Sequence, residues 1–121
     1  MKIVGLKEFL TLPPWTMFRK YQPCYTDDLL WKQASLGERD FIYTSASMPD
    51  GDSSEHVFAA CEDMAENGTS YPIEDWTARD GTFVDDQLFM IYEEEDILKV
   101  QGYIGSALQS IRQHSQKGED K

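Results

Sequence analysis

The stretch Gln87-Leu88-Phe89-Met90-Ile91-Tyr92 decides the fold that this sequence can adopt. Its apolar and aromatic side chains, from Leu88 to Tyr92, cannot all face water, and the run is short enough for one strand. Because both faces of such a strand would be apolar, the pattern predicts a strand in the interior of a sheet. Four acidic residues, Glu93 to Asp96, follow at once. Negative charge stabilises the N-terminus of a helix, so a helix is expected to begin there.

An amphipathic helix is predicted beyond these acids, over about residues 94–112. Apolar residues recur there at spacings of three and four, which places them on one helix face. These residues are Ile97, Val100, Ile104, Ala107, Leu108 and Ile111. That face is expected to pack back over the sheet. The polar segment 113–121 is expected to be a frayed tail.

Three further strands and a middle helix complete the expected architecture. Aromatic and β-branched runs separated by short turns predict an antiparallel meander. Its strands are expected at about residues 15–21, 29–36, 41–46 and 87–92. The middle helix is expected at about 53–66, where Asn67-Gly68 provides a C-terminal stop. The sequence therefore predicts a single α+β domain over residues 1–112, with an antiparallel sheet, a middle helix and a C-terminal helix on the sheet.

The composition favours some classes of partner and disfavours others. The 121 residues include 22 acidic and 11 basic side chains and carry a net charge of −11. Free nucleic acid and anionic membranes would repel such a chain, so neither is an expected partner, whereas basic protein surfaces are. No run of apolar residues approaches the length of a membrane span or a signal core. A cytoplasmic protein with thiol cysteines is therefore expected.

Negative charge is concentrated in the middle of the chain. Fifteen of the 22 acidic residues lie between Asp50 and Asp96. The same segment contains a single basic residue, Arg79. This acidic block can be a set of solvated helix and loop faces, or a surface that steers and binds a basic partner protein. The candidate contacts are Asp85, Asp86, Glu93, Glu94, Glu95 and Asp96, followed by Glu62, Asp63, Glu74 and Asp75.

Aromatic and basic residues in the predicted meander suggest an alternative function. Rings beside guanidinium groups can stack a base and hold a phosphate, so the protein could sequester a nucleotide-like molecule. The candidate ligand-binding residues are Trp15, Arg19, Tyr21, Trp31 and Tyr43. The same residues can instead fill and rim a small core.

Known motifs for catalysis, cofactors and metals are not found. His56 and Cys61 are five residues apart and do not share a helix face, and two Cys with two His give no zinc spacing. The sequence contains no glycine-rich phosphate loop and no nucleophile elbow. No catalytic residues, no cofactor and no metal are therefore expected, and the protein is expected not to be an enzyme.

The C-terminal helix is also a candidate for self-association. Its apolar stripe can exceed what one sheet face needs. Gly102 and Gly105 each lower helix propensity by up to about 1 kcal/mol. Glycines are tolerated where a second backbone approaches closely, so a homodimer through this helix is a second partner hypothesis.

Several segments resemble small acidic accessory proteins of bacteriophages and prophages. They include Gly5-Leu6-Lys7-Glu8-Phe9-Leu10, Lys20-Tyr21-Gln22-Pro23-Cys24, and the region from Arg79-Asp80-Gly81 to Leu88-Phe89-Met90-Ile91-Tyr92. Many proteins of this kind are compact, non-enzymatic and directed at host machinery, including inhibitors of host defence. The resemblance implies an inhibitor that binds a basic host factor, such as a nucleic-acid-binding or defence protein, in the host cytoplasm.

Overall fold

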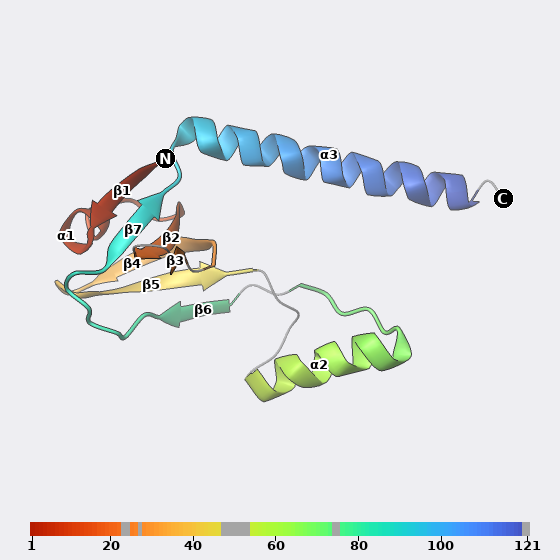
Figure 1. The fold of residues 1–121 in the computed structure, drawn as a ribbon, viewed down its shortest axis with the longest axis horizontal. Coiled ribbons are helices and arrows are strands. Elements are labelled where there is room, and N and C mark those ends of the chain that lie inside the picture. Colours follow the sequence, from red (N-terminus) through yellow and green to blue (C-terminus); the bar gives the residue numbers. More distant parts are fainter. Residues whose placement is uncertain (23–24, 27, 47–53, 74–75, 120–121) are drawn as a thin grey trace.

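One antiparallel sheet and three helices make up the described part of the chain (Figure 1). The computed structural model describes residues 1–22, 25–26, 28–46, 54–73 and 76–119. The strands are β1 (Lys2–Gly5), β2 (Thr16–Gln22), β3 (Tyr25–Thr26), β4 (Leu30–Leu36), β5 (Asp40–Ser45), β6 (Trp76–Arg79) and β7 (Leu88–Ile91). The helices are α1 (Leu6–Phe9), α2 (Ser54–Asn67) and α3 (Glu94–Glu119). The predicted α+β class is confirmed.

Strand β7 lies inside the sheet, as its sequence predicts. The sheet order is β1-β7-β2-β4-β5-β6, with β3 beside β2. Val4 of β1 pairs with Phe89, and Phe18 of β2 pairs with Ile91 on the other side of β7. Strands β2, β4, β5 and β6 form the meander, and the chain then returns to insert β7 between β1 and β2. One face of β7 is buried, through Phe89 and Ile91, whereas Leu88 and Met90 are half-buried.

Four phenylalanines form the centre of the core. Phe9, Phe18, Phe41 and Phe89 are each at most 1% exposed. The ring of Phe9 stacks on Phe89 at 4.0 Å between centroids and meets Phe18 and Phe41 edge-on at 4.7 and 4.9 Å. The short helix α1 places Phe9 there, so β2, β5 and β7 are joined through one side chain from outside the sheet.

Helix α3 does not pack over the sheet, and that prediction is wrong. Figure 1 shows α3 running away from the sheet for most of its length. Every described side chain from Gln101 to Gln116 is exposed. One face of the sheet is already filled by α1 and the phenylalanine cluster, so α3 is not needed to cover that face. The helix also continues past Arg112, the predicted end, so the segment from Gln113 is helical as far as Glu119.

Helix α2 forms where the sequence predicts it and ends at Asn67. Gly68 follows in a left-handed conformation (φ +69°), and its N–H donates to the carbonyl of Met64. This is the glycine helix stop expected from Asn67-Gly68. Neither α2 nor α3 packs along another described element.

Trp15 is held in a strained backbone conformation before β2. Its φ is +72°, and its N–H donates to the Lys32 carbonyl at 2.6 Å. An L-residue pays about 1–2 kcal/mol for a left-handed conformation, and glycine avoids this cost while losing about 0.5–1 kcal/mol to backbone entropy. Because the ring is 67% exposed, little packing is lost on its removal. We expect Trp15→Gly to raise the free energy of unfolding by about 0.5–1 kcal/mol in urea titrations.

The matched control for this prediction is Trp15→Ala, which removes the same ring but keeps the Cβ atom. It should leave the strain in place and give no gain. Equal changes in stability for the glycine and alanine variants would contradict the strain at this position.

Candidate interaction surface

The start of α3 is fixed by two hydrogen bonds of Glu93. The Glu93 carbonyl accepts the first helical bond from the Ile97 N–H at 3.0 Å. The Asp96 carboxylate in turn accepts the Glu93 N–H at 2.9 Å. This carboxylate contact to the cap residue's N–H is one half of a capping box, and it satisfies a donor that the helix leaves free. The acids predicted to begin the helix do begin it.

Two of these acids are also bound to the N-terminal ammonium. The Met1 nitrogen lies 3.1 Å from a Glu93 carboxylate oxygen and 2.8 Å from one of Asp96. Hydrogen bonding to this ammonium, and then to the Glu93 N–H, holds the pKa of Asp96 below its ordinary value. The contact with Asp96, and then with Glu93, raises the pKa of the Met1 amino group. Part of the negative charge at this helix start is therefore neutralised.

The other two acids remain open to solvent. Glu94 and Glu95 are exposed, and neither forms an ion pair with a basic group in the described chain. We call Glu93, Glu94, Glu95 and Asp96 the α3 acidic cluster. With Met1 they line an open hollow of about 270 Å³. The cluster offers two unpaired carboxylates on a rigid helix start.

The acids on α2 form a second group. Glu62 is exposed on this helix. Asp63 accepts hydrogen bonds from Asn67 Nδ2 at 2.6 Å and from the Tyr71 hydroxyl at 2.7 Å. The hydrogen bond from Asn67, and then that from Tyr71, holds the pKa of Asp63 below its ordinary value. Asp63 thus ties the segment after α2 to the helix. The other two predicted contacts of this region, Glu74 and Asp75, lie outside the described residues.

Asp85 and Asp86 lie in a third place, on the segment between β6 and β7. The Arg39 guanidinium donates to Asp85 at 2.7 Å and to the Phe83 carbonyl at 2.7 Å. The guanidinium carbons of Arg39 and Arg79 lie 5.8 and 5.5 Å from the centroid of the Phe83 ring. Asp85 is therefore paired with a base, whereas Asp86 is exposed.

The acidic block of the sequence is divided in three by the fold. The start of α3 lies beside the N-terminus, α2 lies beyond the far end of β5 and β6, and the β6–β7 segment runs along another edge (Figure 1). The candidate acidic contacts therefore do not form a single surface among the described residues. Any acidic contact with a partner has to be assigned to one group.

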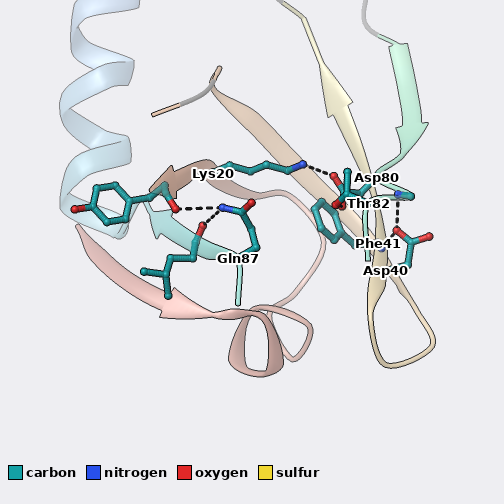
Figure 2. A network of polar contacts seen from close by, with 9 residues as sticks. Lys20, Asp40, Phe41, Asp80, Thr82 and Gln87 are labelled. Carbon is teal, nitrogen blue, oxygen red and sulfur yellow. Dashed lines mark hydrogen bonds and ion pairs between the residues drawn. The ribbon is translucent and has the colours of Figure 1, made fainter. Parts of the chain in front are cut away.

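Two further acids, Asp80 of the acidic block and Asp40 outside it, serve the fold itself (Figure 2). Asp80 forms an ion pair with Lys20 and accepts the Thr82 hydroxyl at 2.6 Å. Asp40, which is 1% exposed, pairs with Arg79 and accepts the N–H groups of Phe41 and Gly81, both at 2.9 Å. These contacts fasten the edge strand β6 and its following turn to the sheet. Asp40 directly precedes the strand predicted at residues 41–46, and no local pattern in the sequence indicates this role.

The five candidate ligand-binding residues are not brought together on one face. Tyr43 packs against the core on the same face as Phe41, whereas Trp31 follows Leu30, a core residue, and so points to the opposite face. Arg19 and Tyr21 lie on that opposite face too, and Arg19 Nε donates to the Tyr92 hydroxyl at 3.0 Å. Arg19, Tyr21 and Trp31 therefore share one sheet face, and Tyr43 lies on the other.

One buried base stands apart from these surfaces. Lys32 is 2% exposed, its Nζ donates to the Leu12 carbonyl at 2.5 Å, and it lies 5.7 Å from the centroid of the Phe9 ring. Burial lowers the pKa of its ammonium. Lys32 joins the loop after α1 to β4.

The described residues form neither a candidate metal site nor a membrane-spanning helix. They contain no group of three or more His, Cys, Asp or Glu side chains placed to hold a metal ion. None of the helices described is both long and apolar enough to cross a membrane.

Comparison with known proteins gives no relative. The chain matches no protein-family model, no curated protein and no solved structure.

Proposed function

We propose that this protein is a non-enzymatic binding protein whose α3 acidic cluster docks onto a basic surface of a partner protein. The observation that carries the proposal is the exposure of Glu94 and Glu95 beside two acids that are already held in place. Their backbone is fixed by the capping bonds of Glu93 and Asp96. Carboxylates on a rigid support lose little entropy when they meet a basic side chain. They also attract a basic partner over several ångströms.

The biological setting of the proposal comes from the resemblance to phage accessory proteins. On that basis the partner is a basic host factor, such as a nucleic-acid-binding or defence protein, and binding inhibits it. The proposal places the protein in the cytoplasm, where reducing conditions keep the half-buried Cys61 as a thiol.

Charge removal tests the proposal directly. A lysate of the host is passed over the immobilised full chain and over a Glu94→Gln/Glu95→Gln variant. We expect a basic protein to bind the wild type and to bind the variant at least about tenfold more weakly, since a charged contact is worth about 1.5–3 kcal/mol. Binding should also weaken between about 0.1 and about 1 M salt, because the screening length falls from about 10 to about 3 Å.

The matched control removes two acids elsewhere. Glu8 and Glu38 are exposed and lie outside the acidic block, so Glu8→Gln/Glu38→Gln causes the same change in net charge. This variant should bind as the wild type does. Binding that is unchanged by both the Glu94/Glu95 substitutions and the salt would rule out a contact through the α3 acidic cluster. Binding that the control variant weakens as much as the Glu94/Glu95 variant does would rule it out too.

A further inference from the structure

Helix α3 carries an apolar stripe that no part of the described chain covers. We define the α3 stripe as Ile97, Val100, Ile104, Ala107, Leu108 and Ile111. At 100° per residue these six positions fall within about 100° of arc. Ile104 and Ile111 are 64% and 61% exposed. Three isoleucines, Ile97, Ile104 and Ile111, recur at the heptad interval that lets one helix pack along another.

The helix itself needs such packing. Helices in water gain most of their stability from burying an apolar face, and α3 has none buried along most of its length. Gly102 and Gly105 each weaken it further by up to about 1 kcal/mol. Both glycines lie off the stripe, and a Cβ atom added to either would meet no atom within 4 Å. No other part of the described chain therefore approaches these glycines closely. The stripe, which carries exposed apolar side chains, is the surface that association would cover.

Charged residues flank the stripe, and their sign changes from the start of the helix to its end. On the helical wheel Glu94 and Arg112 lie about 80° to one side of the stripe centre, and Asp96 and His114 lie about 80° to the other. Each side thus carries an acid near the start of the helix and a base near its end. Glu95 lies opposite the stripe, so it stays accessible in any pairing along the stripe.

We infer that α3 pairs in antiparallel orientation with α3 of a second copy of this chain. A two-fold axis at Ile104 sets Ile104 against the partner's Ile104 and Ile97 against the partner's Ile111. The same axis brings Glu94 beside the partner's Arg112, and Asp96 beside the partner's His114. A parallel pair would instead place Glu94 beside the partner's Asp96 and Arg112 beside the partner's His114. The Glu94–Arg112 pairs, which form in the antiparallel arrangement and not in the parallel one, therefore select the antiparallel dimer.

This inference goes beyond the proposed function and is tested without any other protein present. Sedimentation equilibrium of the full chain is measured from about 1 µM to about 1 mM. We expect a monomer–dimer equilibrium in the wild type. Ile104→Lys should weaken dimerisation at least about 100-fold, because the two-fold axis sets two ammonium groups against each other. The stripe is exposed in the monomer, so circular dichroism should show an intact sheet.

The matched control places the same charge off the stripe. Leu98 is 58% exposed and lies about 120° from the stripe centre, so Leu98→Lys should change the dissociation constant less than about twofold. A wild type that stays monomeric up to about 1 mM, or equal disruption by Leu98→Lys and Ile104→Lys, would overturn the inference.

Charge reversal tests the orientation. Glu94→Arg and Arg112→Glu should each weaken the dimer by about tenfold, since two symmetric pairs turn repulsive, and the double reversal should restore it to within about threefold. In a parallel dimer each single reversal would relieve repulsion and strengthen association. Strengthening by the single variants would therefore overturn the antiparallel arrangement.

Discussion

Replacement of Phe89 by alanine is expected to remove about 3–5 kcal/mol from the free energy of unfolding. The side chain is fully buried on the interior strand β7, and its ring stacks on Phe9 and meets Phe18 and Phe41. Alanine would leave a cavity between four elements that no flexible neighbour can fill. Because small domains have a total stability of about 5–15 kcal/mol, a large fraction of it would be lost.

The control for this prediction is Phe58→Ala on α2, a phenylalanine that is 66% exposed. Its effect should stay within about 0.5 kcal/mol. Urea unfolding followed by tryptophan fluorescence measures both variants. Similar losses for Phe89→Ala and Phe58→Ala would mean that the phenylalanine cluster does not hold the fold together.

The second large effect is expected at Asp40. Alanine at this position leaves the N–H groups of Phe41 and Gly81 without an acceptor and removes the partner of Arg79. Buried donors without partners are costly, so the melting temperature should fall by on the order of 10 °C. Scanning calorimetry of the Asp40→Ala and Asp40→Asn variants measures this fall, and the asparagine variant should lie between alanine and the wild type.

Asp40 also predicts how stability depends on pH. The Arg79 guanidinium, and then the two N–H groups, hold the pKa of this carboxyl below its ordinary value of 3.8 in the folded protein. The unfolded chain therefore binds the proton first, and stability is lost as the pH falls below about 4 towards the lower folded pKa. Asp40→Asn should be less stable than the wild type at neutral pH and should lose less stability on acidification. Parallel acid curves for the two proteins would contradict this role.

The sequence allowed the elements of the fold to be predicted because each has a local cause. The apolar run at Leu88–Ile91 requires an interior strand, and the acids at Glu93–Asp96 with the apolar spacing beyond them require a helix. The edge strand β6, which begins at Trp76, was not among the predicted strands. Asp40, which anchors this strand from 39 residues away in the sequence, has no local pattern.

The arrangement of the surfaces could not be predicted from local patterns. Amphipathicity shows that α3 has a face to cover, but it does not say whether the sheet or another molecule covers it. Charge density along the chain likewise does not show which acids form ion pairs with bases that are distant in the sequence. Asp80 lies 60 residues from Lys20 and Asp85 lies 46 from Arg39, and each is partly neutralised by its base. The exposed acids Glu94 and Glu95 have no such base in the described chain.

The central claim is that the sheet domain is complete in itself and that α3 is covered by a second copy. Hydrogen–deuterium exchange of the full chain at several protein concentrations tests it most directly. We expect exchange in β2 and β7 to be slow at all concentrations, and exchange in residues 97–111 to slow as the concentration rises towards about 1 mM. Protection of residues 97–111 that does not change with concentration would contradict the claim.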